Sequence, residues 1–366
     1  MIKTHFSSLG EIIGYCTSQK LPFAIYSLPN ENQVHCITQD SSVSVLDENS
    51  PLPSAPGFIL HPFIRDKNTP AFFIRKEHKF SFLTQDVAKA DLNENYLFDV
   101  PVVLNKETTK EEHCKKIEEA ITHIKEGEFE KVILSRVQTA DVTGIAPIPA
   151  FVELLEKYIT AFVSLVYIPG KVLWLTATPE LLVAASKDEI STVALAGTKK
   201  SGKDNWTDKE KKEQQLVTDY IHAVLDKHCS RIFMDSPKDI DAGNVAHLKT
   251  SFSAKLESGM WDLVVDLHPT PAVCGVPKQK AMQFILNTEL HKRKYYSGFL
   301  GPCNMDGETN LFVNLRCAEL HGNKADLFIG GGITADSVLQ AEWDETLLKA
   351  NTLLSVLTPE TVIKTK

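Results

Sequence analysis

The stretch that most constrains the fold spans residues 327–350, where a strand-like apolar run enters three consecutive glycines and a charged segment follows. Glycines leave the backbone without Cβ atoms, so an anionic ligand can approach its N–H groups closely. The charged residues are spaced i, i+3 and i+7, which places them on one helical face. Two carboxylates one turn apart can hold a hard cation through oxygen. The residues concerned are Gly330, Gly331 and Gly332, then Glu342, Glu345 and Lys349.

Each of these features also has an ordinary interpretation, namely a glycine-rich turn and a solvated Glu/Lys helix face. Short motifs give many false positives, so the ordinary interpretation is the better one for this stretch taken alone. The rest of the chain must decide between the two.

Composition narrows the class of protein. With 366 residues, 43% of them hydrophobic and 23% charged, the chain can bury a sizeable core in one large domain or in two to three ordinary ones. Its net charge of −8 argues against general binding to nucleic acid or acidic membranes and favours small-molecule partners. The seven cysteines are scattered without a C-x-x-C, and no run reaches membrane-spanning length. We therefore expect a cytoplasmic location.

One helix can be delimited closely from the sequence. Thr109 and Glu112 have capping-box spacing, isoleucines at 117, 121 and 124 form an apolar stripe, and Gly127 stands where a C-terminal cap belongs. Strands are predicted over 130–137, 162–168 and 172–186, the last two joined as a hairpin at Pro169-Gly170. The small residues 194–198 predict a turn at the end of another strand.

Several polar residues interrupt these apolar segments. Glu180 has two interpretations: a solvated carboxylate at a break caused by Pro179, or a buried acid whose pKa is raised so that it can donate a proton. Glu210 and Glu213 continue the inward face of a predicted helix, which gives a second Glu-x-x-Glu pair. An arginine in an apolar strand, Arg316 in 314–318, is rarely unpaired and typically binds a carboxylate.

Taken in order, these motifs resemble those of the chorismate-utilising enzymes, which include anthranilate, aminodeoxychorismate, salicylate and isochorismate synthases. The resemblance covers roughly residues 107–357. The motifs are Lys131-Val-Ile-Leu-Ser-Arg, Pro179-Glu-Leu, Leu195-Ala-Gly-Thr, Lys209-Glu-x-x-Glu213, His268-Pro-Thr-Pro-Ala, Arg316-Cys-Ala, Gly330-Gly-Gly-Ile and Glu342-x-x-Glu-x-x-x-Lys349.

The resemblance implies a fold of the α/β class, of the α+β type: a single large domain in which two packed antiparallel β-sheets are surrounded by helices. Residues 1–105 would be a weakly matching N-terminal part of the fold, and residues 106–366 the chorismate-binding catalytic region. Because the family acts on a small molecule, we expect chorismate as the partner, no nucleic acid, no membrane, and a monomer.

The resemblance also implies roles for individual residues. Lys131 would be the general base and Glu180 the general acid, with Mg²⁺ held by Glu213 and Glu345 and with Glu210 and Glu342 close by. The remaining contacts to substrate would come from Gly197, Thr198, His247, Tyr295, Arg316, Gly330, Gly331, Gly332 and Lys349.

Three positions discriminate among members of the family. A lysine at 131 is typical of isochorismate and salicylate synthases, and Ala196 stands where aminodeoxychorismate synthases carry a nucleophilic lysine. Ala272 stands where salicylate synthases tend to have threonine. Gln214 departs from the histidine that often follows the metal-binding glutamate, and we expect it to affect orientation rather than reaction type.

The resemblance therefore implies Mg²⁺-dependent conversion of chorismate to isochorismate, in which water adds at C2 as the C4 hydroxyl leaves. Two alternatives stay open at this point: another chorismate enzyme, most plausibly a salicylate synthase, and a ligand-binding protein that keeps the fold. Whether the product would feed menaquinone, siderophore or salicylate synthesis is also open.

Overall fold

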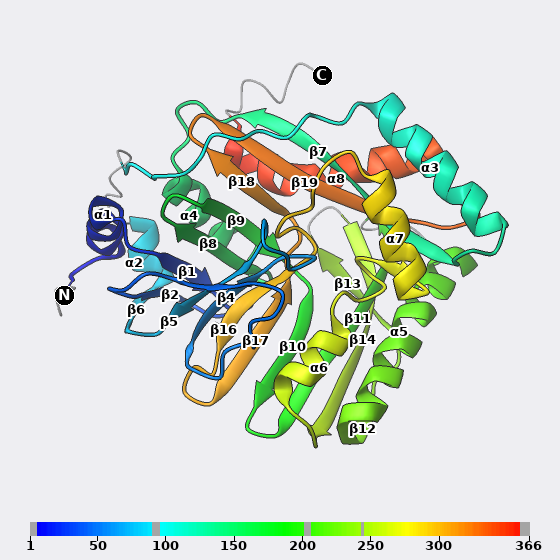
Figure 1. Cartoon of the computed structure of the whole chain (residues 1–366), viewed down its shortest axis with the longest axis horizontal. Coiled ribbons are helices and arrows are strands. Elements are labelled where there is room, and N and C mark those ends of the chain that lie inside the picture. The colour runs from blue at the N-terminus through cyan, green and yellow to red at the C-terminus, as the bar shows by residue number, and fades with distance from the viewer. Residues whose placement is uncertain (1–5, 90–95, 201–205, 243–244, 359–366) are drawn as a thin grey trace.

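The computed structural model of the chain describes residues 6–89, 96–200, 206–242 and 245–358. Within these ranges the strands form two large antiparallel sheets (Figure 1). The first sheet runs in the order β15 (Gly275–Val276), β7 (Lys131–Asp141), β19 (Lys324–Ile333), β18 (Cys317–His321), β9 (Val172–Thr178), β8 (Phe162–Ile168), β1 (Phe23–Ser27), β2 (Gln33–Thr38) and β6 (His78–Leu83).

The second sheet runs in the order β12 (Cys229–Met234), β14 (Val245–Leu256), β11 (Glu189–Lys200), β10 (Leu181–Ser186), β17 (Glu308–Val313), β16 (Phe299–Cys303), β4 (Gly57–His61), β5 (Ala71–Arg75) and β3 (Ser44–Leu46), and β13 (Lys238–Ala242) also pairs with β14. Strands from the first hundred residues thus join both sheets, so the N-terminal part is integral to this architecture.

Helices cover the outer faces of the sheets. Apolar side chains of α1 (Leu9–Gln19), α4 (Pro147–Lys157) and α8 (Leu339–Leu357) pack on the first sheet, and those of α5 (Asp208–His228) and α6 (Met260–Leu267) on the second. At the β7 end, α3 (Lys110–Lys125) and α7 (Lys278–Thr288) share a smaller core, and α2 (Thr84–Lys89) follows β6. Figure 1 shows α8 and α3 beside β7 and β19, and α5 along β11 and β14.

The faces that the two sheets turn toward each other are joined by an aromatic core. The ring of Phe162 on β8 stacks on that of Phe312 on β17, with centroids 4.2 Å apart. Tyr26 on β1 packs on Phe58 on β4, with centroids 5.5 Å apart. Offset aromatic packing of this kind holds two sheets together beyond the apolar area that it buries. The expected fold of two packed antiparallel sheets surrounded by helices is confirmed.

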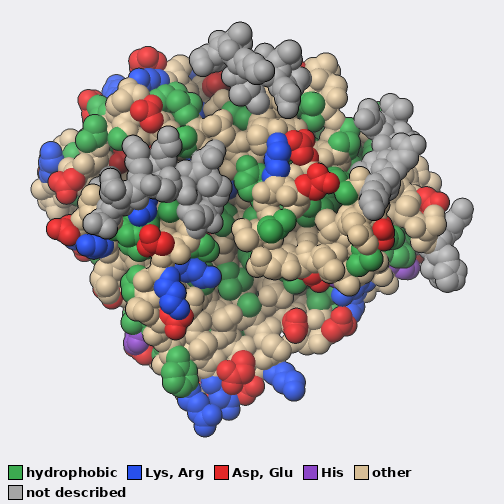
Figure 2. Space-filling view, turned by 180° about the vertical axis from the view of Figure 1, so that it is seen from behind, with side chains coloured by type: hydrophobic (Ala, Val, Ile, Leu, Met, Phe, Trp, Pro, Cys, Tyr) green, Lys and Arg blue, Asp and Glu red, His purple; other side chains and the backbone are tan. Residues whose placement is uncertain are grey.

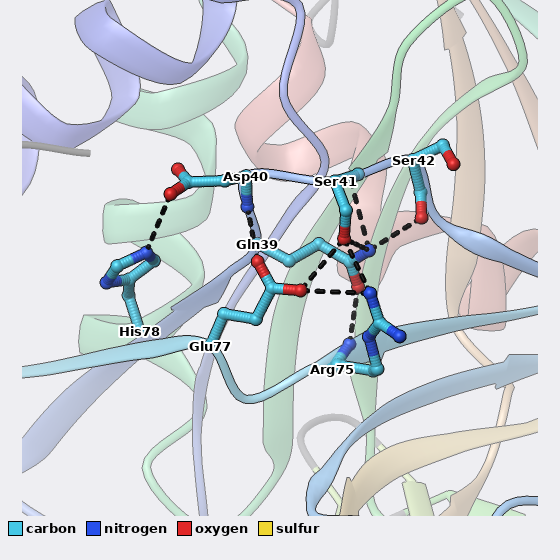
Figure 3. A network of polar contacts seen from close by, with 7 residues as sticks. All are labelled: Gln39, Asp40, Ser41, Ser42, Arg75, Glu77 and His78. Carbon is cyan, nitrogen blue, oxygen red and sulfur yellow. Dashed lines mark hydrogen bonds and ion pairs between the residues drawn. The ribbon is translucent and has the colours of Figure 1, made fainter. Parts of the chain in front are cut away.

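A polar network joins the sheets near the end of β2 (Figure 3). The buried amide of Gln39 accepts a hydrogen bond from the Arg75 backbone N–H at 2.6 Å and donates to the carbonyl oxygen of Ser42 at 2.7 Å. Glu77, in the turn between β5 and β6, accepts from the backbone N–H of Asp40 at 2.8 Å. Because β2 and β6 lie in the first sheet and β5 in the second, these contacts fix the chain where it passes from one sheet to the other.

The capped helix is confirmed. Thr109 caps α3, the side chains of Thr109 and Glu112 form the reciprocal capping box, and Gly127 adopts φ +80° just beyond the last turn. The predicted strand over 172–186 is wrong in one respect: it divides into β9 and β10, which belong to different sheets. Pro179 lies at the division because it has no N–H with which to continue the pairing.

Two further local predictions were wrong. The turn expected at 194–198 is a bulge within β11, where the register shifts between Ala196 and Lys199 and Gly197 adopts φ +66°. A left-handed glycine suits a G1-type bulge as well as several types of tight turn, so the sequence does not separate the two. The three glycines lie inside β19, paired with β7, and not in a turn.

On the molecular surface, acidic and basic side chains are interspersed over the face seen in Figure 2. None of the helices in the described ranges combines the length and the apolar character that crossing a membrane requires.

Candidate active site

The site forms where the chain crosses between the two sheets. One crossing, Pro179-Glu180, joins β9 to β10, and the other, residues 314–316, joins β17 to β18. The crossings are hydrogen-bonded to the neighbouring strands: the Val313 N–H donates to the carbonyl oxygen of Glu180 at 2.9 Å, and the Ala177 N–H donates to that of Arg316 at 3.0 Å. The fold therefore brings an acid and an arginine together that lie far apart in the sequence.

Glu180 is buried, with 4% of its surface exposed. Burial raises the pKa of its carboxyl from 4.5 to about 7, although the positive charges of Lys131 and Lys349 oppose this rise. A carboxyl with that pKa is protonated in a substantial fraction of molecules near neutrality, as a general acid must be. The alternative of a solvated carboxylate at the proline break is excluded.

Lys131 is the first residue of β7 and is fully buried. Its Nζ lies 2.8 Å from Oε1 of Glu213 on α5. A Cβ atom at Gly332 would lie 2.7 Å from the same oxygen and 3.1 Å from Cε of Lys131. Glycine at 332 therefore leaves the space in which the lysine and the acid meet.

The two Glu-x-x-Glu pairs approach the site from α5 and α8. Glu210 belongs to the capping box of α5 and accepts a hydrogen bond from the Thr207 backbone N–H at 2.9 Å. On α8, Glu342 is 4% exposed, and Glu345 lies 2.6 Å from Nζ of Lys349, which also donates to the carbonyl oxygen of Gly330 at 2.9 Å. A Cβ atom at Gly331 would lie within ordinary contact of both α8 carboxylates, at 3.6 and 3.7 Å.

The donor set suits magnesium. Carboxylate oxygens are the ligands that Mg²⁺ prefers, and it commonly takes one or two of them with water and substrate oxygens completing its shell. Among the described residues, no three of these four acids bring one oxygen each within 4.8 Å of one another. Two other groups do bring their ligand atoms that close: Asp40, Glu77 and His78, and His123, Glu126 and Glu128. In this arrangement a cation could therefore take at most two of these carboxylates directly, with other ligands completing its shell.

Arg316 adopts a left-handed backbone conformation, with φ +46°, and its Nη1 donates to Oγ1 of Thr352 at 3.0 Å. Burial lowers the pKa of its guanidinium, an effect that Glu345 opposes. His247 donates from Nδ1 to the carbonyl oxygen of Gly197 at 2.9 Å. Burial, with the charges of Arg316 and Lys349, lowers the pKa of His247 to about 3, so its ring is neutral. It can hold the Gly197 bulge without adding charge to the site.

These groups line a cleft with a volume of about 100 Å³. The predicted site residues that line it are Lys131, Glu180, Gly197, Glu210, Glu213, His247, Arg316, Gly330, Gly331, Gly332, Glu342, Glu345 and Lys349. The small side chains of Ala196 and Ala272 also line it. The side chain of Thr198 lies outside the described part of the structure.

Tyr295 does not line the cleft. Its hydroxyl donates to the carbonyl oxygen of Pro70 at 3.0 Å, and its ring packs edge-on against Trp174 between the sheets. The neighbouring Tyr296 lines the cleft instead, a residue that the sequence reasoning did not select. The apolar wall was also missed: Ile133, Leu195, Val273, Leu315 and Phe328.

Gln214 points away from the cleft. Its Nε2 donates to the carbonyl oxygen of Ala194 on β11 and to Oγ1 of Thr250 on β14, each at 3.0 Å. The side chain is 2% exposed and anchors α5 to the second sheet one residue after Glu213. Gln214 is therefore placed to fix the position of α5 next to Glu213.

Several known proteins resemble this chain. A family model described as chorismate binding enzyme matches residues 63–358. Isochorismate synthase EntC of Escherichia coli (strain K12) is 36% identical over 248 residues, which cover 63% of this chain and 62% of that protein. Isochorismate synthase MenF of Bacillus subtilis (strain 168) is 30% identical over 266 residues, covering 69% and 56%. The chain thus spans less than two thirds of the length of these relatives.

Solved structures show the same fold. The menaquinone-specific isochorismate synthase MenF of Escherichia coli superposes with a TM-score of 0.77 at 20% identity, covering 97% of this chain and 92% of that one. Anthranilate synthase component I of Streptococcus pneumoniae superposes with a TM-score of 0.67 at 19% identity, covering 90% and 89%. An isochorismate synthase and an anthranilate synthase component thus share the fold of this chain.

Proposed function

Because this chain belongs to the chorismate binding enzyme family, we propose that it is an isochorismate synthase, which converts chorismate to isochorismate. The observation that carries this proposal is the presence of a buried lysine and a buried acid with a raised pKa in one cleft, Lys131 and Glu180. Addition of water requires a base for the nucleophile and an acid for the leaving hydroxide, and this cleft offers both.

In the proposed reaction, water attacks C2 of the ring while the C4–O bond breaks and the two ring double bonds shift between these carbons. Lys131 takes a proton from the attacking water. Glu180 gives its proton to the departing C4 hydroxyl, which leaves as water. One water molecule is therefore consumed and one is released in each turnover. Proton transfer at each end contributes about 10²–10⁴-fold to the rate.

The substrate carries two carboxylates, and the cleft has two cationic regions for them. Arg316 offers a planar fork for one, beside the backbone of Gly330 and Gly331. Mg²⁺, held by Glu213 and Glu345 with Glu210 and Glu342 directly or through water, would neutralise the other. In the structure described here Glu213 and Glu345 face lysines, Lys131 and Lys349.

Two side chains that line the cleft bear on the alternative functions. Ala196 cannot form the adduct of aminodeoxychorismate synthases, and Ala272 lacks the hydroxyl found in salicylate synthases, so neither relative's chemistry is favoured. A binding protein that merely keeps the fold has no need for Glu180 with a raised pKa. The monomeric state and the cytoplasmic location stay predictions.

The proposal is tested by product analysis. Purified protein is incubated with chorismate and Mg²⁺, with and without excess EDTA, and the products are separated by liquid chromatography. We expect isochorismate as the main product, formed reversibly and lost with EDTA. Anthranilate in the presence of ammonium, or salicylate as the dominant early product at neutral pH, would refute the assignment.

A further inference from the structure

The outer edge of β7 is completed by side chains. β15 pairs with β7 only at Lys131 and Val132, and it is the last strand on this side of the sheet. Beyond it, the carbonyl oxygen of Ile133 accepts a hydrogen bond from Nη2 of Arg293 at 2.7 Å, and the N–H of Ser135 donates to Oε1 of Glu289 at 2.7 Å. A C=O and the N–H two residues later are the groups that an edge strand offers to a neighbouring strand. Here the side chains of Glu289 and Arg293 take the place of a neighbouring strand.

The side chains of Glu289 and Arg293 form a bidentate ion pair. Nη2 of Arg293 lies 2.6 Å from Oε1 of Glu289, and Nε lies 2.8 Å from Oε2. The side chains are 4% and 2% exposed, and the hydroxyl of Ser135 donates to Glu289 at 2.8 Å as well. Bidentate pairs of this kind are both strong and geometrically specific. The edge of β7 is therefore held in one position.

The same guanidinium reaches a second wall of the cleft. Nη1 of Arg293 donates to the carbonyl oxygen of Val273 at 2.8 Å, and its plane lies over the ring of Phe63 at 4.4 Å. Val273 and Ile133 both line the catalytic cleft, whereas Arg293 and Glu289 do not. Lys131 lies two residues before Ile133 on β7. The buried guanidinium of Arg293 thus links β7, which carries the proposed base Lys131, to residues 272–273 in the wall of the cleft.

We infer that Glu289 and Arg293 are positioning residues for the reaction, which set Lys131 and the Ala272-Val273 wall relative to each other by completing the edge of β7. The inference rests on the proposed function. Because neither residue touches the substrate, their loss should lower kcat more than it raises KM. Misplacement of a reacting group by about 1 Å can cost roughly 10²-fold in rate.

The main test variant is Arg293→Lys, which keeps a positive charge beside Glu289 but cannot bind two carbonyl groups and a carboxylate in one plane. Glu289→Gln/Arg293→Gln is the second variant, because it leaves no unpaired charge in the interior should the first fail to fold. The matched control is Lys294→Gln. It removes the neighbouring ion pair to Glu319 on β18. That strand pairs with β19 and β9 rather than with β7, and neither Lys294 nor Glu319 is among the described residues that line the cleft.

Two readouts are measured on the full chain. Steady-state kinetics with chorismate should show kcat lowered by about 10- to 100-fold in Arg293→Lys, with KM within about threefold of the wild type. Hydrogen exchange followed by mass spectrometry should show faster exchange in the β7 peptide that contains Ser135. Lys294→Gln should match the wild type in both.

A folded variant with kcat within twofold of the wild type, or with unchanged exchange in β7, overturns the inference. A kcat loss accompanied by an equal rise in KM would also overturn it, because the pair would then act on binding. If the wild type forms no isochorismate, the proposed function fails, and the exchange readout still tests whether the pair positions β7.

Discussion

Because the pKa of Glu180 is raised, we expect the stability of the folded protein, as well as its activity, to depend on pH. Its carboxyl is buried without an ion-pair partner within 4 Å among the described residues, and its pKa in the folded protein is about 7, against 4.5 as the ordinary value. Below pH 4.5 the carboxyl is protonated in both the folded and the unfolded chain. As pH rises to about 7, ionisation favours the unfolded chain, so stability is lost over that interval.

The magnitude follows from the two pKa values. At roughly 1.4 kcal/mol per pH unit, the folded state loses about 3 kcal/mol between pH 4.5 and 7 through this one group. Glu180→Gln removes the ionisation and keeps the shape of the side chain. The free energy of unfolding of the variant, relative to the wild type, should therefore increase from pH 5 to pH 8 by up to about 3 kcal/mol.

The assay is urea unfolding of both proteins at pH 5, 6, 7 and 8, with EDTA present. Glu308→Gln, at the exposed start of β17, controls for the amide substitution itself. A stability difference between Glu180→Gln and the wild type that does not change with pH would refute the reasoning. In activity assays the wild-type kcat should fall as pH rises through about 7, and this alkaline limb should be absent from the residual activity of Glu180→Gln.

Four further substitutions test other parts of the site. Lys131→Ala should lower kcat by about 10²–10⁴-fold while equilibrium dialysis still detects chorismate binding, because the lysine is assigned to the water and not to a substrate carboxylate. Arg316→Ala should raise the dissociation constant of chorismate by at least about tenfold, measured by the same dialysis. Glu213→Gln should abolish stimulation by Mg²⁺ in a titration of activity against the metal. Gly330→Ala should lower the melting temperature, since its Cβ would lie 2.5 Å from the Tyr296 hydroxyl and 3.0 Å from the Leu134 carbonyl oxygen, an overpacking worth about 1–3 kcal/mol.

Local signals in the sequence predicted local structure well. The capping box of Thr109 and Glu112 depends on residues three apart, and α3 begins where it predicts. The helical spacing of Glu342, Glu345 and Lys349 likewise placed them on one face of α8 that meets the cleft. Within one element, the period of the helix decides which residues share a face.

Features that depend on distant segments were not predictable in this way. Glu180 lies in the cleft because β9 and β10 belong to different sheets, and the apolar pattern of 172–186 is the same for one strand as for two. Tyr295 and Tyr296 are adjacent tyrosines, and only the position of residues 294–298 between α7 and β16 decides which of them faces the cleft. The two-sheet architecture itself came from the resemblance of ordered motifs and not from periodicity.

The central claim is that this cleft adds water to chorismate. Reaction of chorismate in H₂¹⁸O, followed by mass spectrometry of the product, tests it most directly. The account predicts isochorismate that carries one solvent-derived oxygen, at the C2 hydroxyl, and that forms at a much lower rate with Lys131→Ala. Isochorismate that retains the original C4 oxygen, or a product containing nitrogen from added ammonium, would contradict it.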